Sequence, residues 1–232
     1  MTLACSNLTA GYGKVRIVRD VSVTVDAGEC VTLLGKNGMG KTTLLKSLLG
    51  IANRHAGVVH VLGRDVSGWP THRIVRLGVS YVPQEEPIFS DLTVGENLRL
   101  GGLHVRDYAA AQQRVVTLFP RLGERLRQKA GTLSGGERKL LMIGRALLPE
   151  PKLVLLDEVS EGLQPSMRQV LVDALTAYRQ ERGASLFLVE QNLEFAFAAA
   201  DRFAVLTGGS IVAEGLVGQP GARESIERHL TL

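Results

Sequence analysis

One segment limits the possible folds of this chain more than any other, the loop formed by residues 35–42. Its sequence, Gly-Lys-Asn-Gly-Met-Gly-Lys-Thr, fits the pattern G-x-x-x-x-G-K-[ST] at every fixed position. The apolar stretch Cys30–Leu34 precedes the loop, and a helical pattern over residues 42–49 follows it. Glycines let backbone N–H groups turn inward around phosphate oxygens, and the start of a helix adds partial positive charge. The segment therefore predicts a strand, a phosphate-binding loop and a helix, in that order.

The loop residues have expected parts in binding a nucleotide. Lys41 would neutralise charge on the β- and γ-phosphates and so assist catalysis, and the Thr42 hydroxyl would be a ligand of Mg²⁺. The nucleotide-binding residues expected in this segment are Gly35, Asn37, Gly38, Met39, Gly40, Lys41, Thr42 and Thr43.

A second motif, residues 153–158, complements the loop. Its sequence is Leu-Val-Leu-Leu-Asp-Glu, so a buried strand is expected to deliver two carboxylates at its C-terminal end, where α/β sheets bind ligands. Asp157 would hold the hydration shell of Mg²⁺, and Glu158 could polarise the attacking water. The two motifs together indicate a P-loop NTPase. A GTPase should also carry an N-K-x-D motif after a later strand, and this sequence has none.

Strand and helix patterns alternate along most of the chain, which predicts an α/β fold with a mainly parallel sheet. The expected strands are 15–18, 21–25, Cys30–Leu34, 58–62, 153–156, 185–189 and 203–206. The expected helices are 42–49, 96–100 with Asp91 or Thr93 as its cap, Tyr108–Leu118, one after Gly136, 166–182 and 193–200. In helix 166–182, the residues Val170, Leu171, Ala174, Leu175 and Tyr178 fall on one face and are expected to be buried.

Composition narrows the class further. The chain has 232 residues, 45% of them hydrophobic, yet no apolar run approaches the ~18 residues that a membrane helix requires. The net charge of +4 comes from scattered Lys and Arg with interleaved acids, so we expect no nucleic-acid partner. Without repeats or linkers, residues 1–232 are expected to form a single domain. Its core would be residues 1–86 and 150–232, with a helical subdomain inserted at 87–149.

Residues 133–137, Leu-Ser-Gly-Gly-Glu, lie about twenty residues before the Asp157 strand and resemble the signature motif of ABC ATPases. The resemblance extends over nearly the whole chain and implies the ABC ATPase fold, with an antiparallel β region at the N-terminus. In that family the signature residues, here Ser134, Gly135, Gly136 and Glu137, act on ATP held by a partner. Tyr12 matches the aromatic residue that stacks on adenine, and Gln84 matches the glutamine that contacts Mg²⁺ and the water. Residues 160–163 occupy the place of the partner-contacting loop.

Two positions depart from the family pattern. Val159 follows Glu158 where proline is usual, which frees a backbone N–H and the φ angle. Gln191 stands where the family has its switch histidine. An amide can donate a hydrogen bond to a phosphate oxygen but cannot titrate, so Gln191 is expected to assist catalysis while Glu158 is the base.

The sequence Val-Glu-Gln-Asn at 189–192 is similar to one subgroup, the smaller ATP-binding subunits of branched-chain amino-acid importers. The resemblance implies an ATPase that uses ATP and Mg²⁺ and closes as a homo- or heterodimer over two ATP molecules. It also implies two transmembrane permease subunits, a solute-binding protein, and a peripheral place on the cytoplasmic face of the plasma membrane. Residues 161–165 lean toward urea or short-chain amide importers. Two competing functions are a soluble non-transport ABC ATPase and the ATPase of an exporter.

Overall fold

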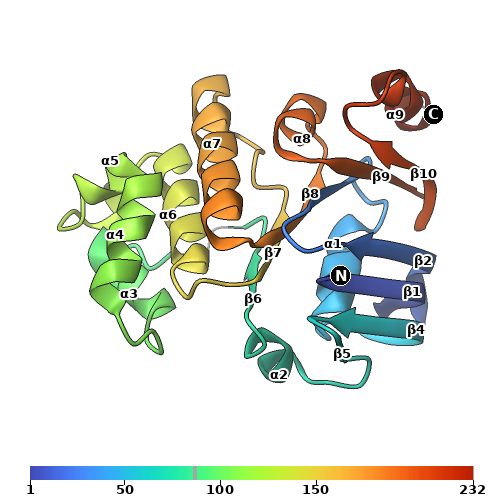
Figure 1. The fold of residues 1–232 in the computed structure, drawn as a ribbon, viewed down its shortest axis with the longest axis horizontal. Helices are drawn as coiled ribbons and strands as arrows, with labels where there is room; N and C mark the ends of the chain where they lie inside the picture. The colour runs from blue at the N-terminus through green and yellow to red at the C-terminus, as the bar shows by residue number, and fades with distance from the viewer. Residues whose placement is uncertain (86–87, 232) are drawn as a thin grey trace.

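Two β-sheets lie on either side of one helix in the computed structural model, which describes residues 1–85 and 88–231 (Figure 1). The enclosed helix, α1 (Lys41–Leu48), buries Leu44, Leu45 and Leu48 in an apolar cluster to which both sheets contribute. The helix that follows the phosphate-binding loop is therefore enclosed between the two sheets.

The first sheet is antiparallel and has the strand order β2-β1-β4-β5. Its strands are β1 (Leu3–Tyr12), β2 (Val15–Val25), β4 (Asn53–Val61) and β5 (Arg64–Asp65). The two strands expected at 15–18 and 21–25 form one strand, because the pairing with β1 continues through both. The irregularity between them is a shift in the register with β1, near Asp20, which has a positive φ of 53°. This sheet confirms the antiparallel N-terminal region.

The second sheet has the order β10-β9-β3-β8-β7-β6 and is parallel except for β10. Its strands are β3 (Cys30–Leu34), β6 (Val79–Val82), β7 (Leu153–Asp157), β8 (Ser185–Glu190), β9 (Arg202–Thr207) and β10 (Ser210–Leu216). Every residue of β3, β7 and β8 is buried, as the continuous apolar runs predict for strands covered on both faces.

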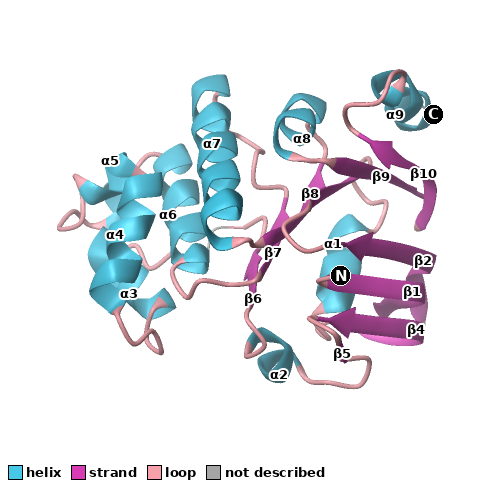
Figure 2. Cartoon of the chain, viewed as in Figure 1, coloured by secondary structure: helices cyan, strands magenta, loops and turns pink. Residues whose placement is uncertain are grey.

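Helices gather at one end of the molecule, away from the first sheet (Figure 2). They are α3 (Val94–Gly101), α4 (Tyr108–Leu118), α5 (Pro120–Gly123), the short 3-10 helix η1 (Ala130–Thr132), α6 (Gly135–Leu147) and α7 (Pro165–Arg182). Thr93, rather than Asp91, caps α3 through a reciprocal pair of bonds with Glu96. The predicted start of the helical subdomain, at 86 and 87, lies outside the described residues.

The buried face of α7 differs from the prediction at one position. Val170 is exposed and Val172 is buried, whereas Leu171, Ala174, Leu175 and Tyr178 are buried as expected. Helix α8 (Leu193–Ala199) packs against α7, and Phe195 of α8 lines a cavity together with Val172. Because α8 covers this side of α7, the buried face includes Val172 in place of Val170. The sequence of α7 alone does not contain this information.

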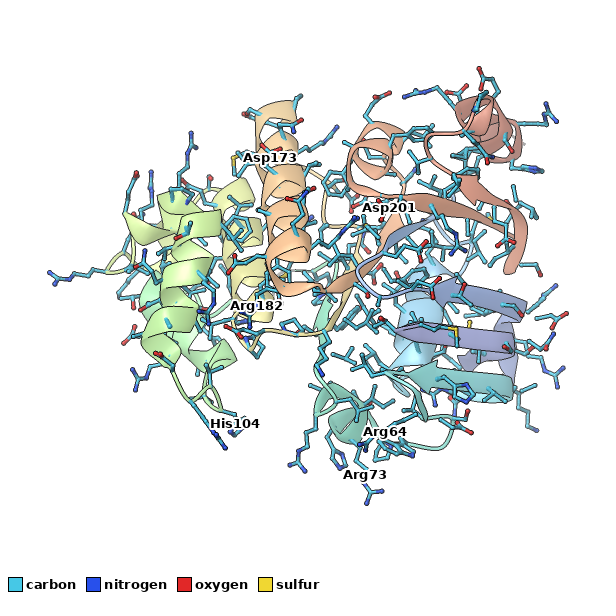
Figure 3. All side chains as sticks on the ribbon, in the orientation of Figure 1. Arg64, Arg73, His104, Asp173, Arg182 and Asp201 are labelled. Atoms are coloured by element: carbon cyan, nitrogen blue, oxygen red, sulfur yellow. The ribbon has the colours of Figure 1, made fainter. Side chains whose placement is uncertain are left out.

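An acidic residue between α6 and β7 links two helices of the helical end, α4 and α7. Glu150 has a positive φ of 55° and forms ion pairs with Arg114 of α4 and Arg182 of α7. Figure 3 labels Arg182 at the end of α7 that faces the helical layer. The remaining helices are α2 (Thr71–Val75) and α9 (Ala222–Thr231). No helix among the described residues is both long and apolar enough to cross a membrane.

Candidate active site

The predicted motifs meet at one edge of the parallel sheet. Strands β3, β8, β7 and β6 are neighbours and point the same way, so the segments after them leave at the same edge. The phosphate-binding loop follows β3, and Gln191 follows β8. Asp157 ends β7 and Glu158 comes next, and Gln84 lies shortly after β6. This is the edge at which α/β sheets bind ligands.

A cavity of about 380 Å³ opens above the loop. Gly40, the residue before α1, has φ 101°, and a Cβ there would lie 3.0 Å from Ile17 Cγ2, so only glycine fits without strain. The residues that line this cavity are Ile17, Asn37, Gly38, Gly40, Lys41, Thr42, Thr43, Gln84 and Glu158. Ile17, on β2, was not predicted from the sequence.

Two predicted loop residues face other parts of the fold. At Gly35, an added Cβ would lie 2.6 Å from the backbone oxygen of Leu206, so the glycine allows close contact with β9. The Met39 sulfur accepts a hydrogen bond from the backbone N–H of Gly208 at 3.3 Å. Both residues hold the loop against the β9–β10 side of the sheet.

Lys41 is buried, and its ammonium contacts three oxygen atoms. Its ammonium donates to the backbone oxygens of Gly35 at 2.8 Å and Lys36 at 3.0 Å, and forms an ion pair with Glu158 Oε1 at 2.9 Å. The Lys41 and Glu158 side chains are only 3% and 6% exposed. Such a buried pair persists only because hydrogen bonds compensate for the loss of water.

Asp157 accepts two hydrogen bonds that orient its carboxylate. The Thr42 hydroxyl donates to Oδ1 and the Tyr81 hydroxyl donates to Oδ2, both at 3.0 Å. Burial raises the pKa of Asp157, and these two hydrogen bonds act in the opposite direction. Burial also raises the pKa of Tyr81, which therefore remains a neutral donor. Tyr81 was not predicted as a site residue.

Glu158 is held in an unusual backbone conformation. Its φ is 49°, a left-handed value that costs a non-glycine residue roughly 1–3 kcal/mol. Its N–H donates to the backbone oxygen of Val189 at 2.8 Å. The Gln84 amide donates to Glu158 Oε2 at 3.2 Å and to Glu161 Oε2 at 2.7 Å. Val159, the departure from the family pattern, is completely buried in the core beneath the helices.

A second cavity of about 230 Å³ adjoins the first, and Glu158 lines both. Gln191 lies in this second cavity and is not among the residues that line the phosphate cavity. The lining residues are Glu158, Ser160, Glu161, Gly162, Arg168, Glu190, Gln191 and Asn192. Glu190 stands out because it is a carboxylate with 1% exposure that directly follows four apolar residues of β8. That break in the apolar pattern is the signal by which the sequence could have revealed it.

The signature residues begin helix α6. The Ser134 hydroxyl accepts from the N–H of Glu137, and the Glu137 carboxylate accepts from the N–H and hydroxyl of Ser134. Gly136 packs against Met167, since an added Cβ would lie 3.3 Å from it. The described residues that line the two cavities do not include Ser134, Gly135, Gly136 or Glu137.

A lysine on the same helix does reach the loop that contains Glu158. Lys139 is 6% exposed, and its ammonium donates to the backbone oxygens of Glu158 at 3.3 Å and Glu161 at 2.9 Å. A lysine next to the apolar run at 140–143 is the sequence signal that was overlooked. Tyr12, at the end of β1, is 44% exposed and does not line the phosphate cavity.

Comparison with known proteins agrees with this geometry. Residues 18–161, more than half of the chain, match the family described as "ABC transporter". The fold also matches a solved structure titled "Structure of ATP binding subunit of ABC transporter". That match has a TM-score of 0.84 and 28% identity, and covers 97% of this chain and 94% of the other.

Two curated relatives cover almost the whole chain. The "High-affinity branched-chain amino acid transport ATP-binding protein BraG" of Pseudomonas aeruginosa is 45% identical over 212 residues, which are 90% of this chain and 91% of the relative. The "Lipopolysaccharide export system ATP-binding protein LptB" of Escherichia coli is 36% identical over 92% of this chain and 90% of the relative.

Proposed function

This chain belongs to the ABC transporter family, and from that membership we propose that it is the ATP-hydrolysing subunit of an importer of branched-chain amino acids. The observation that carries the proposal is the convergence of Lys41, Thr42, Asp157, Glu158 and Gln84 at one edge of the sheet. The amino-acid class is supported by the identity to the branched-chain relative, which is higher than the identity to the lipopolysaccharide exporter subunit.

In this proposal the phosphates of ATP occupy the cavity above the loop. Lys41 exchanges its bond to Glu158 for bonds to the β- and γ-phosphates, because a phosphate presents more negative charge than one carboxylate. The backbone N–H groups of the loop and of the first turn of α1 bind the remaining phosphate oxygens. Tyr12 is assigned to adenine, at the outer end of β1.

The residues around Asp157 suit a magnesium ion. The Thr42 hydroxyl donates to the buried Asp157 carboxylate at 3.0 Å, and Thr42 and Gln84 both line the cavity above the loop. Oxygen donors of this kind are what Mg²⁺ takes from proteins, usually with several waters and the phosphates. We assign Thr42, Asp157 and Gln84 as its protein contacts, and the bound ion would supply charge neutralisation at the phosphates.

Glu158 is assigned as the general base. Once Lys41 binds phosphate, the Glu158 carboxylate is free to accept a proton from the water that attacks the γ-phosphate. Gln191, in the adjoining cavity, is assigned a supporting hydrogen bond to the phosphate, and it has no titratable group.

The signature residues act, in this proposal, on the ATP of a second ATP-binding subunit. Ser134 and the N-terminus of α6 would form a second anion site in the chain, outside the residues that line the chain's own phosphate cavity. Two such chains, identical or related, would therefore close over two ATP molecules. The permease partners, the solute-binding protein and the cytoplasmic face of the plasma membrane follow from the importer assignment.

A urea or short-chain amide importer is the second candidate, favoured by the sequence of residues 161–165. Reconstitution of the chain with its two permease subunits and its solute-binding protein would separate the two. We expect ATP hydrolysis to rise when the binding protein is loaded with leucine or valine, and not with urea or acetamide. Stimulation by urea alone would replace the amino-acid assignment, and hydrolysis insensitive to any permease would refute the transport role.

A further inference from the structure

The carboxylate of Glu190 occupies a central place that the proposed mechanism leaves unexplained. Glu190 ends β8, the strand between β3 and β7, and is paired in register with Leu34, the residue before the phosphate loop. On the other side, Asp157 pairs with Val189. Glu190 therefore lies between the two strands that carry the proposed site, and a buried acid there must find partners.

Both oxygens of Glu190 are bound by one residue of the loop that follows β7. The Ser160 N–H donates to Oε1 at 3.0 Å, and the Ser160 hydroxyl donates to Oε2 at 2.7 Å. Ser160 is itself 1% exposed. The preceding residue of β8, Val189, accepts the N–H of Glu158. Two successive residues of β8 thus bind positions 158 and 160, on either side of the buried Val159.

These contacts explain how Glu158 is kept in a conformation that it would not adopt alone. A non-glycine residue persists at φ 49° only where its surroundings fix the backbone on both sides. Lys139 adds bonds to the backbone oxygens of Glu158 and Glu161, so the loop is held from α6 as well. Among the described contacts, Glu190 is the side chain that accepts from both the N–H and the hydroxyl of Ser160.

We propose that Glu190 is a positioning residue for Glu158, acting through Ser160 to aim the Glu158 carboxylate into the phosphate cavity. The inference rests on the proposed function, because it takes Glu158 as the base. Glu190 is not among the described residues that line the phosphate cavity, so its effect is on kcat and not on nucleotide binding.

The geometry makes a sharp distinction between two substitutions. In Glu190→Gln, the amide oxygen still accepts from the Ser160 N–H, and the amide nitrogen donates to the Ser160 hydroxyl, which can accept as well as donate. In Glu190→Ala, both bonds are lost. The positioning role therefore predicts that glutamine restores what alanine removes.

The test is steady-state hydrolysis of ATP by the full chain in four variants, Glu190→Ala, Glu190→Gln, Ser160→Ala and the Glu190→Ala/Ser160→Ala double variant. We expect Glu190→Ala to lose about 10–100-fold in kcat, with KM for ATP within about 3-fold of wild type, since small misplacements of a catalytic group cost about this much. Glu190→Gln should stay within about 3-fold of wild type. The double variant should lose no more than Glu190→Ala alone, because both changes break the same contact.

Hydrogen exchange supplies a measurement that does not depend on activity. Amides in a peptide covering residues 157–163 should exchange faster in Glu190→Ala than in wild type, and at the wild-type rate in Glu190→Gln. Normal kcat in Glu190→Ala, equal losses in the alanine and glutamine variants, or additive losses in the double variant would each overturn the proposal. Glu158→Gln, measured alongside, separates the two failures, because an active Glu158→Gln overturns the proposed function itself.

Discussion

Replacing Glu158 with glutamine changes one carboxylate oxygen into an amide nitrogen at the point where the two cavities adjoin. The substitution keeps the volume of the side chain, and the remaining oxygen can still accept from Lys41, which now lies 2.9 Å from Glu158 Oε1. Two things are lost: the ability to accept a proton, since an amide has none of the basicity of a carboxylate, and the hydrogen bond that Oε2 accepts from the Gln84 amide at 3.2 Å. The second loss is one hydrogen bond, worth about 0.5–1.5 kcal/mol, so a much larger fall in rate reports the loss of the base.

The expected loss of rate follows from that chemistry. General-base assistance contributes about 10²–10⁴-fold, so single-turnover hydrolysis should slow by about that factor. The affinity for ATP, in contrast, should increase. Lys41 would exchange an ion pair with a carboxylate for a hydrogen bond to an uncharged amide oxygen, which makes the ammonium easier for a phosphate to capture. A gain of ~1 kcal/mol corresponds to roughly five-fold tighter ATP binding.

Gln191 provides the matched comparison. It lines the second cavity together with Glu158, and its proposed contribution is one hydrogen bond. Gln191→Ala should therefore cost about 1–3 kcal/mol, less than the loss of a base. Gln191→His should remain active, because histidine is the usual residue of the family at this position.

Single-turnover hydrolysis of the three variants, with ATP affinity measured separately, decides the matter. Glu158→Gln should also accumulate a dimer on size-exclusion chromatography in the presence of ATP. If Glu158→Gln hydrolyses ATP nearly as fast as wild type, Glu158 is not the base and the mechanism fails. If Gln191→Ala is equally inactive, positioning by Gln191 matters as much as the base.

Four further outcomes are expected. Lys41→Ala should weaken ATP binding or abolish turnover, and near-normal values of both in a binding and hydrolysis assay would contradict the phosphate assignment. Tyr12→Ala should raise KM for ATP more than it lowers kcat, by an amount equivalent to roughly 1–3 kcal/mol; an unchanged KM would leave Tyr12 as a turn residue. Ser134→Arg should bind ATP yet hydrolyse little, and normal hydrolysis independent of protein concentration would argue against a shared site. Burial raises the pKa of Glu190 from its usual value near 4.5 to about 7. Between these two pH values the folded state therefore binds more protons than the unfolded state, and the free energy of unfolding falls as the pH rises. Glu190→Gln should remove this fall and gain roughly 2–3 kcal/mol over wild type between pH 5 and pH 8 in urea titrations, whereas parallel pH profiles would show that Glu190 does not titrate in this range.

Local signals account for the elements that the sequence predicted well. Helix α4 has the predicted bounds, and α1 begins and ends one residue before its predicted bounds. The start of α1 is marked by the glycine-rich loop, and the start of α4 by the capping acid Asp107. Strand β6 was missed, since it has four residues and carries polar Ser80 and Tyr81 between its two buried valines. Helix α9 was missed because it is covered by the distant strand β9 and helix α8 through Ile226.

The same limit applies to the site. Each motif could be assigned to a strand end from its own residues, but the contacts between motifs depend on which strands are neighbours. Tyr81 reaches Asp157 because β6 lies beside β7, and Ser160 reaches Glu190 because β8 lies on the other side of β7. Strand order is a property of the whole fold, so these partners could not be predicted from the spacing of residues along the chain.

The enclosure of α1 between two sheets has a mechanical consequence. Helix α1 has a sheet on each side, whereas α3, α4 and α5 stand at the end of the molecule away from the first sheet (Figure 1). We therefore expect α1 to deform less than these three helices. Strain introduced at the phosphate loop would be transmitted through α1 with little local deformation and would be relieved at the more compliant helical end. A pair of fluorescent probes on β2 and α4 should report that displacement, and a pair on β2 and β10 should not.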